Sequence, residues 1–139
     1  MTEQILVAEG FFAETADGPR LLGSRCRSCE APCFPRSALC RNPDCDDSHM
    51  EETHSGPRGT LWSCALQNYP PPPPARYEEP YQPYAIGVVD LDEGLRVVGR
   101  MSVDDPMTLK VGSDVELTIE PIWRDDEGRD VMTWKFKPL

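Results

Sequence analysis

The chain has 139 residues, a formal net charge of -10 and a sequence pI near 4.6. A chain this acidic is a poor candidate for binding duplex nucleic acid or a membrane surface, because binding to a phosphate backbone depends on Lys and Arg side chains that release counterions. Its length suits one ordinary domain or two small units, and the lack of a signal-peptide pattern at residues 1–10 and of a long apolar run predicts a cytoplasmic protein.

The N-terminal segment, residues 4–16, is predicted to form a short amphipathic helix or a pair of turns. Its apolar side chains at helical spacing are Ile5, Ala8, Phe12 and Ala16. Gly10 interrupts the pattern and Asp17-Gly18-Pro19 ends it, before a short predicted strand over residues 20–24. A helix this short is marginal alone, so we expect this helical arm, residues 1–22, to dock on the rest of the chain or on a partner.

Four cysteines follow in the order C-x2-C, ten residues, C-x4-C: Cys26, Cys29, Cys40 and Cys45. The spacing is typical of two metal-binding knuckles, because a tetrahedral four-sulfur site needs two pairs of thiolates that each lie on a tight turn. We expect one zinc ion, although a single iron fits the same geometry. A ribbon of about thirty residues cannot bury enough apolar surface to fold alone, so the zinc is expected to be structural.

The second knuckle is two residues wider than the first, so its loop is expected to bulge. This leaves Cys33 or His49 open as a replacement for one ligand. Otherwise Cys33 is expected to pack inside the ribbon and Cys64 inside a core strand, since a free cysteine behaves as a small hydrophobe. Disulfides are the competing interpretation of a cysteine-rich segment, and the predicted cytoplasmic location disfavours them.

The same region is mildly basic within an acidic chain. Residues 20–45 contain five arginines against only Glu30 and Asp44. Arg25, Arg27 and Arg36 are therefore candidates for contacts with a phosphate-bearing ligand or an acidic partner surface. The alternative is that they are ordinary solvated side chains.

A new unit begins at Gly56-Pro57-Arg58-Gly59, and five short strands are predicted after it. They cover residues 59–67, 84–91, 96–101, 114–121 and 132–137. Turns are predicted at residues 92–94 and 125–128, and Gly112 is expected to adopt an unusual backbone angle before the fourth strand. Five short strands in about eighty residues favour a small closed barrel of the OB type.

Residues 69–84, between the first two predicted strands, hold seven of the fifteen prolines. They also hold all four tyrosines, Tyr69, Tyr77, Tyr81 and Tyr84. Proline gives a sheet no donor, so this segment cannot be a central strand. A polyproline II arm with tyrosines is well suited to contact a partner. A connection that binds nothing and a ligand for an SH3-type domain are the alternatives.

Taken together, these motifs resemble the DUF35 family of rubredoxin-like zinc ribbons fused to an OB-fold. The resemblance rests on Leu21 to Cys29, Phe34-Pro35-Arg36, Cys40 to Cys45, Ser55 to Ser63, and residues 83–100 and 109–117, and so covers essentially the whole chain. The fold expected is mainly β, with the helical arm at residues 1–22, the zinc ribbon at 23–55 and a five-stranded OB-fold barrel at 56–139.

The resemblance implies a non-catalytic accessory subunit that binds and activates a thiolase-like enzyme, a thiolase or a retro-aldolase, acting on acyl-CoA thioesters. It further implies that the ribbon and barrel shape the substrate entrance. There the positive bias of the ribbon leads us to expect the phosphates of coenzyme A near Arg25, Arg27 and Arg36. Because thiolase-like proteins are usually dimers, a heteromer with two copies of each chain is expected. The residues themselves agree with a non-catalytic role. The only histidines that could serve as a catalytic base, His49 and His54, lie in a polar segment, and four cysteines would leave a zinc ion no open position for a substrate.

Three other functions compete with this one. An OB-fold module for single-stranded nucleic acid needs a basic groove, and residues 56–139 carry nine Lys and Arg against fourteen Asp and Glu. An iron-filled ribbon would transfer electrons and colour the protein red. An accessory subunit of an acyl-CoA hydratase is the third alternative, and it too follows from the family resemblance.

Overall fold

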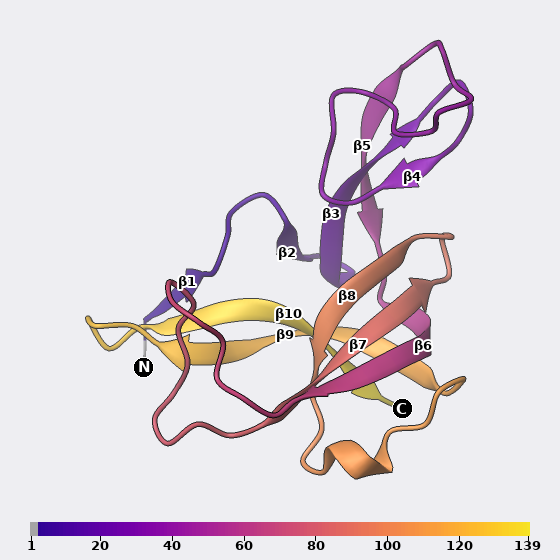
Figure 1. Ribbon diagram of the computed structural model, residues 1–139. Helices are drawn as coiled ribbons and strands as arrows, with labels where there is room; N and C mark the ends of the chain where they lie inside the picture. The colour runs from indigo at the N-terminus through magenta and orange to yellow at the C-terminus, as the bar shows by residue number, and fades with distance from the viewer. Residues whose placement is uncertain (1–2) are drawn as a thin grey trace.

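The C-terminal part of the chain forms a closed barrel of five strands (Figure 1). The computed structural model describes residues 3–139. The barrel strands are β6 (Arg58–Gln67), β7 (Tyr84–Leu91), β8 (Arg96–Met101), β9 (Asp114–Arg124) and β10 (Asp130–Pro138). Their order around the barrel is β6-β7-β8-β10-β9 and back to β6, and only β8 and β10 run parallel. This is the topology of an OB-fold, so the predicted five-stranded barrel is confirmed.

The barrel interior follows the alternation of side chains along its strands. Along β7, Ala85, Val89 and Leu91 point inward and are buried. Phe136 of β10 is fully buried in the same core. Gly99 of β8 makes room for it, because a Cβ atom at this position would lie 2.9 Å from the Phe136 ring. The core therefore depends on a pairing of small and large residues on neighbouring strands.

The predicted turns lie where the sequence places them. Gly94, Gly112 and Gly128 all have positive φ angles, of 92°, 91° and 78°. Gly112 thus supplies the unusual backbone angle expected before the fourth barrel strand. The loop between β8 and β9 also contains a single 3-10 turn, η1 (Pro106–Thr108), the sole helical element within residues 3–139. No helix in that range is long and apolar enough to cross a membrane.

The cysteine-rich part forms a long, narrow sheet that projects from the barrel (Figure 1). Its central strand is β3 (Gly18–Cys26), which pairs with β5 (Met50–Ser55) along one edge. Along the other edge β3 pairs first with β2 (Phe12–Thr15) and then with β4 (Pro32–Cys33). All these pairings are antiparallel, and the knuckles lie at the end of the sheet farthest from the barrel.

The predicted N-terminal helix is wrong. The segment forms β1 (Gln4–Leu6), which adds to β10 in parallel, and then β2, which turns back on β3. Gly18, with φ of 103°, begins β3 directly after the turn, and Phe12 of β2 is 1% exposed in the core. The apolar spacing fits a helix, but strand partners from distant parts of the sequence override it. The division of the chain at residues 22/23 and 55/56 stays a prediction, and β3 runs across the first of these points.

Four aromatic rings join the ribbon to the barrel. Trp134 of β10 lies at the centre, with ring centroids 5.6 Å from Phe34, 5.7 Å from Phe12 and 6.5 Å from Phe11. Its indole Nε1 donates a hydrogen bond to the Val98 carbonyl at 3.1 Å. We call these four rings, Phe11, Phe12, Phe34 and Trp134, the joint cluster. Since Phe34 follows β4 directly, the cluster ties the metal-binding end of the chain to the barrel wall.

Candidate metal centre and partner surfaces

The four predicted cysteine ligands come together at the tip of the ribbon. Their sulfur atoms all lie within 4.8 Å of one another. The Cys29 and Cys40 sulfurs are 3.5 Å apart, and those of Cys26 and Cys45 are 3.9 Å apart. A tetrahedral zinc with Zn–S bonds of about 2.3 Å requires sulfurs about 3.8 Å apart. The donor set and its spacing therefore fit a zinc ion, and all six cysteines of the chain are free of disulfides.

The first knuckle is shaped by the turn that follows β3. The amide of Cys26 donates to the Ala31 carbonyl at 3.0 Å, and the amide of Glu30 donates to the Cys26 carbonyl at 2.7 Å. Glu30 has a φ of 65°, the left-handed conformation that lets the chain reverse tightly. This turn places Cys26 and Cys29 on the same side of the chain.

The wider second knuckle is organised by Asn42. Its carbonyl accepts a hydrogen bond from the Cys45 amide at 3.0 Å, and its side-chain Oδ1 accepts one from the Asp44 amide at 3.1 Å. The Cys40 amide donates to the Ser48 hydroxyl at 2.9 Å. The two extra residues thus form an Asx-type turn, which gives the expected bulge a definite shape.

Backbone N–H groups lower the pKa of the thiols in the first knuckle, whereas burial and the neighbouring cysteines raise the pKa of those in the second. Hydrogen bonds from the backbone N–H groups of His49 and, to a smaller extent, Cys29 lower the pKa of Cys26 to about 6. A hydrogen bond from the Ala31 N–H is the main cause of the lowered pKa of Cys29. The Asn42 N–H favours the Cys40 thiolate, but burial and the neighbouring cysteines outweigh it and raise its pKa to about 12. Four adjacent thiolates therefore need a cation, and zinc binding releases protons.

The alternative ligands do not join the cluster. Cys33 is buried on β4, which confirms its expected packing inside the ribbon, and it is not among the four clustered residues. His49 instead lies 3.0 Å from an oxygen of Asp47. The prediction that Cys64 packs in a core strand is wrong, because Cys64 lies on β6 but its side chain is exposed. No residue of β6 after Leu61 is buried, so Cys64 lies on a part of the strand that the core does not cover.

The candidate arginines lie along the ribbon and two of them have acidic partners. Arg36 Nη1 is 2.6 Å from Glu52, and Arg27 Nε is 3.8 Å from Glu51. Arg25, opposite Glu51 in the sheet register, forms no ion pair with any residue in the range 3–139. The candidate arginines are therefore partly paired and partly unpaired, and their role stays a prediction.

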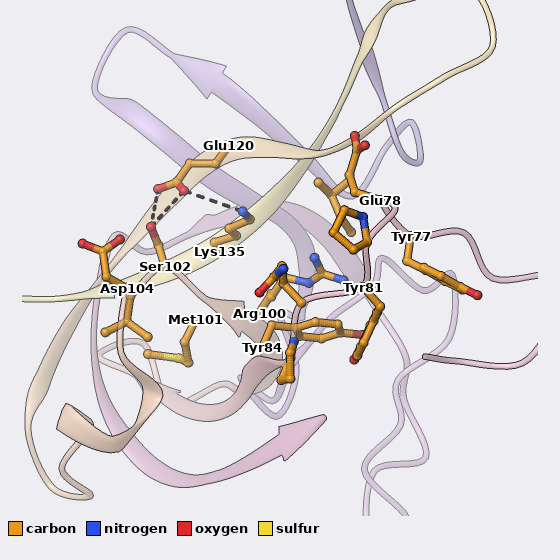
Figure 2. Close-up of a pocket in the computed structure, with 15 residues that line it drawn as sticks. Tyr77, Glu78, Tyr81, Tyr84, Arg100, Met101, Ser102, Asp104, Glu120 and Lys135 are labelled. Atoms are coloured by element: carbon orange, nitrogen blue, oxygen red, sulfur yellow. Dashed lines mark hydrogen bonds and ion pairs between the residues drawn. The ribbon is translucent and has the colours of Figure 1, made fainter. Parts of the chain in front are cut away.

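The tyrosine-rich loop connects β6 and β7 and contains no strand between residues 68 and 83, as predicted. Tyr69 is 79% exposed at its beginning. Tyr77, Tyr81 and Tyr84 form an edge-to-face series, with centroids 5.5 Å and 6.3 Å apart (Figure 2). The Tyr81 hydroxyl donates to the Gln67 carbonyl at 2.7 Å, which fixes the loop to the end of β6. Burial raises the pKa of Tyr81, so the phenol keeps this proton at neutral pH.

Tyr81→Phe tests whether that hydrogen bond holds the loop. We expect a loss of about 1 kcal/mol in stability and faster amide hydrogen exchange at the paired ends of β6 and β7, Gln67 and Tyr84, because the Gln67 carbonyl loses its partner. Tyr77→Phe is the matched control, since no residue in the described part of the chain hydrogen-bonds the Tyr77 hydroxyl. Equal exchange rates in the two variants would contradict the prediction.

Sequence reasoning missed two groups of residues. The joint cluster could not be predicted, because its rings come from three separate segments and the sequence pattern predicts a helix at Phe12. Arg100 and Lys135 were also missed, although they lie directly opposite each other on β8 and β10. The alternation of outward-pointing residues in the third and fifth predicted strands was the available signal, but it does not say which strands are neighbours.

Two family models match the chain. The model described as the ChsH2 rubredoxin-like zinc ribbon domain matches residues 15–51, and the model described as the ChsH2 C-terminal OB-fold domain matches residues 52–120. Among curated proteins, a DUF35 domain-containing scaffold protein of Methanothermobacter thermautotrophicus is 30% identical over 122 residues, which cover 85% of this chain and 86% of that protein.

Two further relatives carry names of enzymes. The benzoylsuccinyl-CoA thiolase subunit BbsA of Geobacter metallireducens is 28% identical over 87% of this chain and 76% of its own length. A solved structure titled Ltp2-ChsH2(DUF35) aldolase superposes with a TM-score of 0.64 at 25% sequence identity, covering 86% of this chain and 84% of that one. The zinc ribbon, the closed barrel and the sequence matches all point to one family.

Proposed function

We propose, from the premise that this chain belongs to the DUF35 family of zinc-ribbon and OB-fold proteins, that it is the accessory subunit of an enzyme acting on acyl-CoA thioesters. The partner is a thiolase-like chain that makes or breaks a carbon–carbon bond, as a thiolase or a retro-aldolase, and it holds the catalytic residues. The observation that carries this proposal is the similarity to a protein named as a thiolase subunit, over 87% of this chain. The similarity to a structure titled as an aldolase supports the same class.

The metal centre supports a structural role for this subunit. All four donors are cysteine sulfurs, and a zinc ion held by four thiolates has no open position for substrate or water. We infer that the zinc stabilises the ribbon, whose short strands have few buried side chains of their own.

The assembly that we propose has two copies of each chain and works in the cytoplasm. Thiolase-like proteins are usually symmetric dimers, and symmetry then gives each half of the dimer one accessory subunit. The tyrosine-rich loop and the ribbon are the surfaces offered to the partner, because both project from the barrel and expose aromatic or charged side chains (Figure 1). In this position the ribbon lies beside the substrate entrance and holds the partner in its active form.

Affinity purification of the tagged chain from its native host tests the proposal, with mass spectrometry of the bound proteins and light scattering of the complex. A thiolase-like protein recovered at equal stoichiometry, in a particle with two copies of each chain, supports it. A chain recovered alone, or with nucleic acid, would contradict it and favour an independent OB-fold module.

We further propose that Arg25, Arg27 and Arg36 face the phosphates of coenzyme A. Reversing all three to glutamate is expected to raise the acyl-CoA KM of the assembled enzyme about tenfold or more, because a charged hydrogen bond contributes roughly 1.5–3 kcal/mol. Steady-state kinetics with the purified complex measures this. Arg58→Glu is the control, since Arg58 is an exposed arginine of the barrel that pairs with Glu116 in the same way. An unchanged KM in the triple variant would leave these arginines as ordinary surface residues.

A further inference from the structure

A pocket of about 430 Å³ lies between the tyrosine-rich loop and the barrel wall (Figure 2). One side is formed by residues 77–84 of the loop, and the other by residues of β8, β9, β10 and the segment that follows β8. This volume lies within the range of small-molecule sites in proteins. Nothing in the proposed function requires this pocket, so a ligand for it is inferred separately from the residues that line it.

Arg100 is the unusual residue of this pocket. Its guanidinium carbon lies 3.5 Å from the centroid of the Tyr84 ring, which holds the group flat against the loop. The other five arginines of residues 56–139 each lie within 4.0 Å of a carboxylate: Arg58, Arg76, Arg96, Arg124 and Arg129. Within residues 3–139, Arg100 has no ion pair or side-chain hydrogen bond. Among the arginines of residues 56–139, Arg100 alone lines a pocket without an acidic partner.

Lys135 brings a second cation to the same wall. It lies opposite Arg100 in the parallel register of β10 and β8, and like charges in directly opposed positions destabilise a sheet. The Lys135 charge is balanced, because its Nζ is 3.7 Å from a carboxylate oxygen of Glu120, whose two oxygens also accept from the Ser102 hydroxyl at 2.8 Å (Figure 2). Burial is the main cause that lowers the pKa of Lys135, and the nearby Arg100 lowers it further.

The remaining acidic groups at the pocket do not reach Arg100. Glu78 accepts a hydrogen bond from the Arg124 amide at 2.7 Å, and Asp104 lies on the exposed rim. Arg100 is thus the one cation of the pocket lining without an ion pair. It is a guanidinium, whose planar donors match the two oxygens of a carboxylate. Around it stand Tyr81, Tyr84 and Ile122, which offer an apolar surface.

We propose that this pocket binds a carboxylate carried on an aromatic or branched apolar group, with Arg100 as its bidentate partner. A singly charged carboxylate is favoured over a doubly charged phosphate, because the lining also holds Glu78, Asp104 and Glu120, whose carboxylates repel a second negative charge more strongly. Tyr84 holds the guanidinium in position before the ligand arrives, so little side-chain entropy is lost on binding. The carboxylate belongs either to a free organic acid or to a side chain of the partner subunit, and both have the same chemistry.

Titration of the zinc-loaded full-length chain with sodium benzoate, followed by amide chemical shifts in NMR spectra, tests the proposal without the partner. We expect saturable shifts in residues 81–84, 100 and 135. Benzamide has the same shape without the charge and is expected to bind at least about tenfold more weakly. Equal binding of the two compounds, or no saturable shift with benzoate, would overturn the proposal.

Three variants of two arginines on β8 locate the site. Arg100→Gln is expected to weaken benzoate binding about tenfold, and Arg100→Lys less, because lysine keeps the charge but loses the planar fork. Arg96→Gln is the matched control, since Arg96 lies on the same strand but pairs with Asp90 at 2.6 Å and stacks on Trp62. Benzoate affinity that is unchanged in a folded Arg100→Gln variant refutes the site.

The same titration on the assembled complex identifies the source of the carboxylate. If a free acid is the ligand, benzoate binds the complex with the affinity it has for the single chain. If a partner carboxylate fills the pocket, benzoate no longer binds the complex and Arg100→Gln weakens assembly. The proposal fails if the complex neither binds benzoate nor responds to Arg100→Gln.

Discussion

Cys26→Ser is expected to reduce the zinc content from one ion per chain to nearly none and to unfold the ribbon. Structural zinc contributes roughly 10–16 kcal/mol of apparent binding free energy in small zinc domains, and this energy is also folding energy. Cys26 is also fully buried at the end of β3, where a serine would place a hydroxyl in the position of the sulfur. Zinc analysis of the purified protein and limited proteolysis of residues 23–55 measure the two effects.

Loss of partner activity is expected to accompany the loss of zinc. The control is Cys64→Ser, because Cys64 is an exposed thiol outside the cluster. It should keep full zinc content and full activity of the complex. Normal zinc content and normal complex formation in Cys26→Ser would show that the ribbon does not depend on this ligand.

Trp134→Ala is expected to cost about 3 kcal/mol of unfolding free energy, the lower end for removing a large aromatic side chain, because the indole is only partly buried. The substitution removes the ring that the other three members of the joint cluster contact, together with the hydrogen bond to the Val98 carbonyl. Urea unfolding followed by circular dichroism gives the free energy. Partner binding should also weaken, since the ribbon loses its fixed attachment to the barrel.

Trp62→Ala provides the comparison for this result. Trp62 is 52% exposed on β6 and contacts Arg96, with the guanidinium carbon 3.9 Å from the ring centroid. Removing an exposed ring of this kind costs about 1 kcal/mol or less. If Trp134→Ala destabilises the protein no more than Trp62→Ala, the joint cluster does not hold the two parts together.

Most of the barrel could be predicted from local sequence. The strands β7 and β8 have the predicted bounds, and β6, β9 and β10 extend the predicted ones by one to three residues at an end. This worked because alternating apolar residues between glycine and proline turns restrict the chain to short strands. The same reasoning failed at residues 4–16, where an equally regular spacing of apolar residues was read as a helix. There the outcome depends on β10, which is far away in sequence and supplies the pairing for β1.

The metal site could be predicted because its signal is almost entirely local. Each pair of cysteines lies within one turn, and ten residues that include β4 separate the two turns, so four sulfurs come together within twenty residues of the chain. Cys64 shows the limit of such reasoning. Its place on a strand was predicted, but its exposure depends on how far the packed core reaches along β6, and no residue of β6 after Leu61 is buried.

The sequence by itself determined the zinc ribbon, the five barrel strands and the family. Tertiary structure alone decided which strands are neighbours, and thereby placed Arg100 opposite Lys135 and gathered the joint cluster around Trp134. The physical reason is the range of the interactions involved. Turns, knuckles and strand alternation depend on residues a few positions apart, whereas strand pairing and ring packing depend on closure of the whole barrel.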